Sequence, residues 1–186
     1  MCFCSLNSFC TQHMLLMMFP FFASLDFVCG VSDMLGWEVF LWLLHVSVTL
    51  YLTGLIWTIQ RVHYPLFDRV DRLGYVEFAR EHTGRITSIV MVPMLVELLS
   101  AGYFALYPPK GLSSVLMWGG LACVFVIWVV TFSLSVPAHQ KLGLGYDAQA
   151  HQRLVVTNWF RTVFWTGRAV LVFWGTWLML AEVSLR

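Results

Sequence analysis

Apolar residues form four long runs that are separated by shorter, more polar stretches. The runs cover residues 39–59, 86–107, 115–136 and 162–181. Each has roughly the 20 residues that a helix needs to cross a bilayer core about 30 Å thick. Because backbone polar groups in lipid find no water to bond, such runs are expected to be helical. Aromatic residues near their ends are typical of interfacial belts: Trp37, Trp42, Trp57, Tyr64, Tyr107, Trp159 and Trp177.

Composition agrees with this pattern. Of the 186 residues, 59% are hydrophobic and only 11% are charged, against roughly a quarter charged in a soluble domain. The predicted fold is therefore all-α, an integral membrane four-helix bundle with short cytoplasmic helices in two of its loops. A formal net charge of +1 without a Lys/Arg-rich run argues against a nucleic-acid partner, because phosphate neutralisation needs clustered cations. The lipid bilayer is the expected partner.

The first part of the chain, residues 1–33, is poorly defined by its pattern. Its apolar stretch contains Pro20 and Asp26 and lacks the basic start of a secretory signal. Two interpretations stay open. The segment is either a fifth, poorly formed span or sequence upstream of the true start, since Met34 directly precedes the first convincing span. The transmembrane domain is predicted to cover residues 34–186.

Cations are distributed unequally between the two sides of the predicted membrane. Residues 61–85 carry five of them and residues 137–161 carry three, whereas the opposite side has Lys110 and Arg186. Because short loops rich in Lys and Arg stay on the cytoplasmic side, both long loops are predicted to be cytoplasmic. The protein is then a multi-pass protein of the bacterial inner membrane, with the turn at residues 108–111 outside.

Both cytoplasmic loops contain stretches with helical spacing. Residues 70–81 mix apolar and charged positions, and residues 148–157 lead directly into the fourth apolar run. We therefore expect a short helix in the first loop and an extension of the fourth span in the second. Pro65 and Pro137 are expected to break the helices that precede them.

The topology places four span ends on the cytoplasmic side, so their polar residues should gather at one mouth of the bundle. They are Gln60, Arg61, His63, Glu81, His82, Arg85, His139, Asn158 and Arg161. Three imidazoles, several guanidinium groups, an amide pair and a carboxylate at one mouth are typical of a binding site. The alternative is that they simply solvate the helix ends, which commonly carry cations.

Two charges lie deeper. At a rise of 1.5 Å per residue, Glu97 lies roughly 18 Å past Arg85, and Arg168 roughly 15 Å past Asn158. Both therefore reach a similar depth near the bilayer middle, where an unpaired charge is costly and where ionisable residues face the bundle interior or a cavity. Glu97 and Arg168 are candidate partners. A purely structural ion pair is the alternative to a functional one.

Arg161 and Arg168 are seven residues apart, so they should share one face of the fourth span. Their planar forks would bind a carboxylate or phosphate group, which favours an amphiphile with an acidic head. Alternatively, Arg161 only extends its head to the interface. The predicted ligand-binding residues are Gln60, Arg61, Glu97, Asn158, Arg161 and Arg168.

Three histidines are the candidate metal ligands: His63, His82 and His139. Imidazoles from different segments hold zinc, iron or copper, and two of them flank a haem. No local ligand motif supports them. A haem or a transition metal is thus an open cofactor hypothesis. His45 is expected to be a buried hydrogen-bonding residue, and His151 receives no role.

Five segments resemble a family of small bacterial four-span membrane proteins of unassigned activity. They are WTIQRVHYPLF (57–67), EHTGRI (81–86), PMLVEL (93–98), VPAHQKLGLGYD (136–147) and NWFRTVFWTGR (158–168). The resemblance extends from residue 35 to the end of the chain. That group is distantly similar to the anthrone-oxygenase-like membrane proteins, whose fungal members are associated with oxygenation of polyketide anthrones. The resemblance implies a four-span fold and an oxygenase-like activity as one alternative.

Three functions are compatible with these residues. The first is binding of a small amphipathic or aromatic molecule in a cytoplasm-facing His/Arg/Glu pocket. The second is a membrane redox enzyme that uses a metal or haem. The third is an accessory subunit of a larger membrane complex. A homo-oligomer is a further partner hypothesis. The residue pattern does not distinguish a binding protein from an enzyme.

Overall fold

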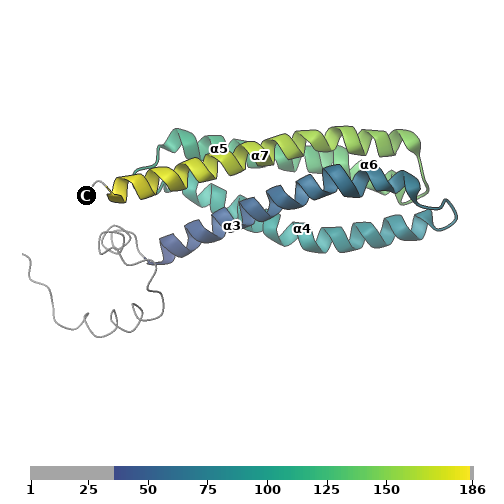
Figure 1. Ribbon diagram of the computed structural model, residues 1–186, viewed down its shortest axis with the longest axis horizontal. Helices are drawn as coiled ribbons and strands as arrows, with labels where there is room; N and C mark the ends of the chain where they lie inside the picture. Colours follow the sequence, from purple (N-terminus) through teal and green to yellow (C-terminus); the bar gives the residue numbers. More distant parts are fainter. Residues whose placement is uncertain (1–35, 185–186) are drawn as a thin grey trace, which may run out of the picture.

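The computed structural model describes residues 36–184, and within this range it is a bundle of four long helical columns without strands (Figure 1). The elements are α3 (Gly36–Thr58), η1 (Ile59–His63), η2 (Tyr64–Arg69), α4 (Tyr75–Leu106), α5 (Ser114–Val130), η3 (Thr131–Ser135), α6 (Val136–Leu142) and α7 (Ala148–Ser184). All four columns are long and apolar enough to cross a membrane. The predicted all-α four-helix membrane fold is confirmed. The prediction for residues 1–33 lies outside the described residues.

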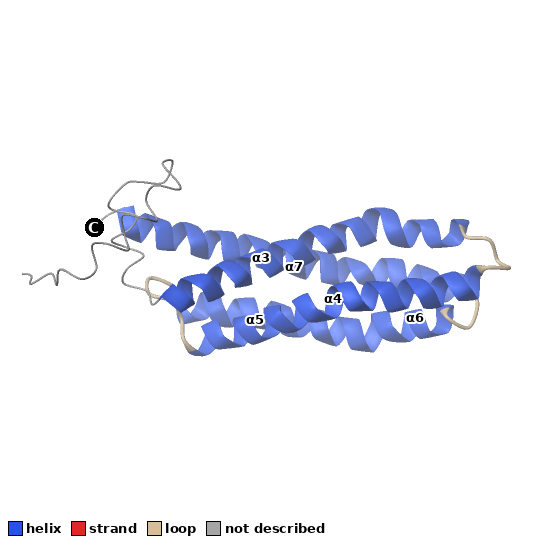
Figure 2. Ribbon diagram, turned by 90° about the horizontal axis from the view of Figure 1, so that it is seen from below, coloured by secondary structure: helices blue, strands red, loops and turns tan. Residues whose placement is uncertain are grey.

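Each column packs against two neighbours. Contacts join α3 to α4, α4 to α5, α5 to α7, and α7 back to α3. Consecutive columns run in opposite directions, and both views show them side by side along their length (Figures 1 and 2). The result is an up-down-up-down bundle, the arrangement that short connections favour.

The columns are longer than the apolar runs, so the connections at one end are short. Residues 70–74 and 143–147 form these connections, and we call this end of the molecule the loop end. A separate loop helix over residues 70–81 is not present: residues 70–74 are the connection, and residues 75–81 are the start of α4. The extension expected over residues 148–157 is confirmed as the start of α7.

Asp147 begins α7. Its side chain accepts a hydrogen bond from the Ala150 backbone N–H (Asp147 Oδ1 to Ala150 N, 2.7 Å). An acidic side chain at this position satisfies a backbone N–H that would otherwise lack a partner and complements the positive end of the helix dipole. The Lys141 ammonium lies 2.8 Å from the other carboxylate oxygen, so Asp147 also connects α6 to α7.

The expectation that Pro65 and Pro137 break their helices is wrong. Each lies two residues after a five-residue π-helical segment, η1 or η3, and helical structure continues beyond it. Proline lacks the N–H that would bond the carbonyl four residues earlier, and its ring crowds that carbonyl. A wider turn before the proline accommodates both effects without ending the column.

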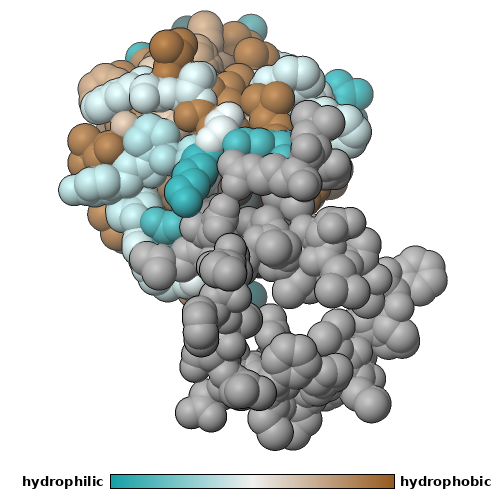
Figure 3. Space-filling view, turned by 90° about the vertical axis from the view of Figure 1, so that its left-hand side faces the viewer, coloured by the Kyte–Doolittle hydropathy of each residue, from teal (hydrophilic) through white to brown (hydrophobic). Residues whose placement is uncertain are grey.

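The opposite end contains the turn at residues 107–113 and the end of α7. Gly111 has φ of +80° there, a conformation that glycine adopts without steric cost. Figure 3 looks onto this end and shows hydrophobic side chains reaching its margin. Along the columns, large apolar side chains such as Phe40, Leu99 and Phe125 are exposed, as expected for surfaces that face lipid.

Two aromatic residues assigned to the interfacial belt are instead buried. Trp42 packs on Phe104 inside the bundle, and its indole N–H donates to the Thr176 hydroxyl (3.2 Å). Tyr64 is 3% exposed and lies at the junction of η1 and η2. Both residues were assigned to the belt from their places near the ends of apolar runs, and such a place does not determine which side chains point into the bundle.

Candidate functional site

Glu97 is the centre of a buried polar network in the middle of the bundle. Its carboxylate accepts hydrogen bonds from Arg168 Nε (2.8 Å), from the Thr49 hydroxyl (3.1 Å) and from Trp165 Nε1 (2.9 Å). Glu97 and Arg168 are 1% and 2% exposed. The ion pair expected between these two residues is therefore present, with additional donors that satisfy the carboxylate.

His45 completes this network on the other side of Arg168. Arg168 Nη2 lies 2.9 Å from His45 Nε2, and His45 Nδ1 lies 2.6 Å from the Ser100 hydroxyl. A guanidinium group only donates, so His45 Nε2 must accept and Nδ1 must carry the proton. Ser100 then accepts from His45 and donates to the Val96 carbonyl (2.7 Å). His45 is a neutral, hydrogen-bonded residue, as expected.

This network connects α3, α4 and α7 through side chains whose hydrogen-bond donors and acceptors are paired with one another. A fully connected buried network favours one helix arrangement over others, because every alternative packing would leave a buried polar group unpaired. A cavity of about 20 Å³ beside His45 and Arg168 has room for about one water. The geometry assigns Glu97 and Arg168 to the structure of the bundle.

Gln60 and Asn158 form a second buried contact nearer the loop end. Asn158 Nδ2 donates to Gln60 Oε1 (2.8 Å), and Gln60 Nε2 donates to the Val155 carbonyl (3.2 Å). Gln60 belongs to η1 and Asn158 to α7. Since both amides are buried and face each other, they hold the π-helical end of the first column against α7.

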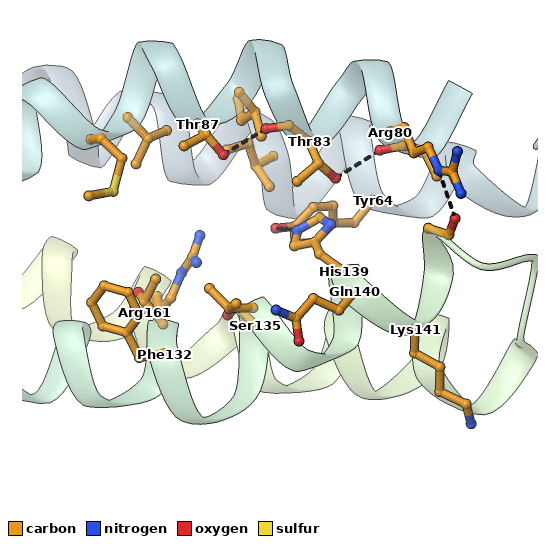
Figure 4. A pocket seen from close by; sticks show the side chains of 18 of the residues that line it. Tyr64, Arg80, Thr83, Thr87, Phe132, Ser135, His139, Gln140, Lys141 and Arg161 are labelled. Carbon is orange, nitrogen blue, oxygen red and sulfur yellow. Dashed lines mark hydrogen bonds between the residues drawn. The ribbon is translucent and has the colours of Figure 1, made fainter. Parts of the chain in front are cut away.

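A cavity of about 940 Å³ opens between α4 and the segment formed by η3 and α6 (Figure 4). At the loop end it is lined by Arg80, Lys141 and Leu144, and at its deep end by Met91, Met94 and Phe132. Apart from Arg161, which Figure 4 shows beside Phe132, the deep end is apolar, and the outer end carries two cations. Its size matches sites for small molecules, which range from about 300 to 1,000 Å³.

Arg161 enters this cavity from α7, and Figure 4 shows its side chain reaching into the open space. The residue is 7% exposed, and its guanidinium carbon lies 5.7 Å from the centre of the Trp165 ring. It interacts with the Tyr64 side chain. Arg161 Nε has no hydrogen-bond partner among the described residues. None of the described residues that line the cavity carries a carboxylate, so the Arg161 charge is not neutralised by them.

Tyr64 and His139 lie together on the cavity wall. The Tyr64 hydroxyl and His139 Nε2 share a hydrogen bond of 3.0 Å, and both side chains line the cavity (Figure 4). His151 Nε2 lies 2.7 Å from the Tyr64 backbone carbonyl. His151, which received no role from the sequence, therefore fixes the backbone that positions the phenol.

Four aliphatic hydroxyls line the cavity, and three of them already have partners. Thr83, Thr87 and Thr131 each donate to the carbonyl four residues earlier in their own helix. Ser135, in contrast, is 1% exposed, and its hydroxyl has no partner among the described residues. Ser135 is the last residue of the π-helical segment η3.

The three candidate metal ligands do approach one another at the loop end. The ring centres of His63 and His82 are 5.1 Å apart, and those of His82 and His139 are 6.0 Å apart. Within residues 36–184, however, no three His, Cys, Asp or Glu side chains are placed so that they could hold a metal ion. The His82 ring stacks on Phe78 and on His139, and it lies edge-on to Phe67. We derive no chemistry through a metal from this arrangement.

The six predicted ligand-binding residues are thus divided among different environments. Arg161 lines the large cavity, whereas Glu97, Arg168, Gln60 and Asn158 are engaged with other side chains outside it. Arg61 is exposed at the loop end. Two further residues of the predicted mouth, Glu81 and Arg85, pair with each other on the surface of α4.

Sequence reasoning did not identify Tyr64 or Ser135 as cavity residues. Tyr64 directly follows one π-helical segment and Ser135 ends the other, and each lies within two residues of a proline. The signal available in the sequence was that Pro65 and Pro137 each follow the end of an apolar run. π-helical turns occur frequently at functional sites, and here both flank the cavity.

Comparison of the chain with protein families, with curated proteins and with solved structures finds no match.

Proposed function

We propose that this protein is a membrane receptor or carrier for a small amphipathic molecule, which it binds in the cavity between α4 and α6. The observation that carries the proposal is Arg161, a buried cation in a cavity whose described lining residues include no carboxylate. A buried charge without a counter-charge is costly. An acidic group on a bound molecule would supply the missing negative charge.

The shape of the cavity supports an amphipathic ligand. Its outer end carries Arg80 and Lys141, and its deep end is formed by apolar side chains. The Lys141 charge is already paired with Asp147, and Arg80 Nε donates to the Gly143 carbonyl (3.4 Å). Since Lys141 is neutralised and Arg80 is exposed, the buried Arg161 is the cation best suited to hold a ligand.

We further propose that the protein resides in the bacterial inner membrane with the loop end in the cytoplasm. Eight of the chain's cations belong to the segments at residues 61–85 and 137–161, which meet at this end. Cytoplasmic loops carry such an excess. The cavity would then be reached from the cytoplasm or from the inner leaflet.

Binding is tested with dansyl-undecanoic acid and dansyl-undecanol added to the protein in phosphatidylcholine nanodiscs, with empty nanodiscs as the blank. We expect saturable fluorescence enhancement with one or both probes. Thr83→Trp, which fills the cavity, should abolish the saturable part. Thr58→Trp is the matched control, because Thr58 also bonds a carbonyl four residues earlier but is exposed outside the cavity. Absence of saturable binding in the unmodified protein would refute the proposal.

A second candidate function is a redox enzyme with a haem or transition metal on His63, His82 and His139. The proximity of the three rings favours it, although the side chains would have to move to share one ion. Elemental analysis and the visible spectrum of the purified protein test it. Stoichiometric metal or a haem band that His82→Ala removes would support this function, and a colourless, metal-free protein would leave the binding function or an accessory-subunit role.

A further inference from the structure

Two hydrogen-bond donors in the cavity lack partners, and they are located on the same side of it. Arg161 Nε and the Ser135 hydroxyl are both buried without a hydrogen-bond partner among the described residues. Both side chains come from the wall opposite α4 (Figure 4). Buried polar atoms are almost always bonded in folded proteins. Two unpartnered donors in one cavity therefore indicate where an acceptor group of a ligand would lie.

The other hydroxyl donors of the cavity are already used. The Tyr64 hydroxyl bonds His139, and the threonine hydroxyls bond helix carbonyls. Gln140 also lines the cavity but is exposed. Among the buried donor atoms of the described lining residues, the unpartnered set thus consists of one guanidinium edge and one hydroxyl, which is a small site. This site suits a ligand group that has two acceptor oxygens and needs no further hydrogen-bond donors from the protein.

The charge of the site selects a monoanion. Arg161 provides the single buried positive charge of the cavity. Of the two outer cations, Lys141 is paired with Asp147, and Arg80 is exposed, so its charge lies outside the buried part. A phosphate monoester carries up to two negative charges, so one would remain uncompensated in the buried part of the cavity. Burying an uncompensated charge is strongly unfavourable. A carboxylate matches the single charge, and its two oxygens match the guanidinium fork.

The apolar part of the ligand is defined by the deep end of the cavity. Met91, Met94 and Phe132 line it together with Ile86 and Val90. Flexible methionines adapt to hydrocarbon of varied shape. We infer that the protein binds an amphipathic monocarboxylate, with its carboxylate on Arg161 and Ser135 and its hydrocarbon body against the methionine-lined deep end of the cavity. This inference rests on the proposed binding function and names its ligand class.

The test compares palmitate, hexadecanol and hexadecyl phosphate as competitors of the dansyl probes in phosphatidylcholine nanodiscs. A hydrogen bond to a charged group contributes about 1.5–3 kcal/mol, so palmitate should bind about 10- to 100-fold more tightly than hexadecanol. It should also bind more tightly than hexadecyl phosphate.

Arg161→Gln should remove the preference for palmitate over hexadecanol, and Ser135→Ala should reduce palmitate affinity about fivefold. Arg153→Gln, an exposed arginine on the same helix, should change neither.

A second measurement does not depend on folding of the variants. The carboxyl carbon of ¹³C-labelled palmitate reports its ionisation through its chemical shift. With the unmodified protein, we expect a saturable signal from ionised palmitate at a pH where palmitate in empty nanodiscs is largely protonated. A bound signal that titrates like the lipid-dissolved acid would overturn the inference.

Failure of this inference and failure of the proposed function are distinguishable. If the dansyl probes bind saturably but palmitate and hexadecanol compete equally, or hexadecyl phosphate competes best, the ligand class is wrong and the binding function stands. If no probe binds saturably, both are wrong.

Discussion

Arg161 and Arg168 lie seven residues apart on α7, yet within the described part of the chain only Arg168 of these two has a carboxylate partner. Arg168 Nε donates to Glu97 at 2.8 Å, whereas Arg161 Nε has no partner among the described residues. The two guanidinium groups therefore have different roles. Arg168 closes a network that fixes three helices, and Arg161 supplies the buried positive charge of the cavity.

The Glu97–Arg168 pair should show strong coupling in a double-mutant cycle. Glu97→Gln or Arg168→Gln alone leaves one buried charge unpaired and should lower the free energy of unfolding by about 3–5 kcal/mol. The double variant carries no unpaired charge and should be milder than the sum of the two single changes. Unfolding in mixed micelles with increasing denaturing detergent measures all four proteins. Additive losses would contradict the pairing.

His45 should be replaced better by glutamine than by leucine. The amide oxygen of the introduced glutamine can occupy the position of the ring Nε2 and accept from Arg168, whereas leucine leaves that donor unsatisfied, at a cost of about 1–3 kcal/mol. Thermal unfolding of the two variants checks the order. Nitrogen NMR of the unmodified protein should in addition show His45 neutral with the proton on Nδ1. A charged ring would refute the tautomer that we assign.

Gly120 should not tolerate a side chain. A Cβ atom at this position would lie 2.9 Å from Arg168 Nη1, and Arg168 cannot easily move because Glu97 and His45 hold it. Gly120→Ala should therefore lower stability by about 1–3 kcal/mol. Gly119→Ala is the matched control, since a Cβ there meets no atom within 4 Å. Equal effects of the two substitutions would show that Arg168 is free to shift.

Asp147 should contribute to stability at neutral pH and lose this contribution in acid. The hydrogen bond from Lys141, with help from the Ala150 backbone N–H, lowers the pKa of the Asp147 carboxyl below its ordinary value. A lowered pKa in the folded protein means that the contribution is complete above the ordinary value of about 3.9. It is lost as pH falls through the lower, folded value. Asp147→Asn should remove this part of the pH dependence from thermal unfolding curves.

Reporter fusions should place the two ends of the bundle on opposite sides of the membrane. A fusion within residues 143–147 should report a cytoplasmic position, and a fusion within residues 108–111 should report the opposite side, because the cation excess is at the loop end. Alkaline phosphatase and green fluorescent protein fusions provide complementary signals. The reverse pattern would place the cavity mouth outside the cytoplasm.

The fold followed from the sequence because bilayer physics leaves few choices. Apolar runs of about 20 residues in the sequence must form helices that satisfy their own backbone. The depth of Glu97 and Arg168 likewise followed from helical rise, since a regular helix converts residue number into distance. Charge burial then made their pairing the expected outcome, and the structure contains it.

The cavity could not be derived in the same way. Its position depends on two π-helical turns, η1 and η3, which shift the register of the columns where Tyr64 and Ser135 lie. Counting at 100° per residue through these turns assigns side chains to wrong faces. Tyr64, expected at the membrane interface from its place near the end of an apolar run, is buried in the bundle. The sequence by itself determined the number of membrane-spanning helices and the uneven distribution of cations between their ends, because these depend on local composition. Only the tertiary structure decided that Arg168 is neutralised and that Arg161 is not neutralised by the described residues, because a partner for a buried charge depends on which side chains of other helices lie within hydrogen-bond distance.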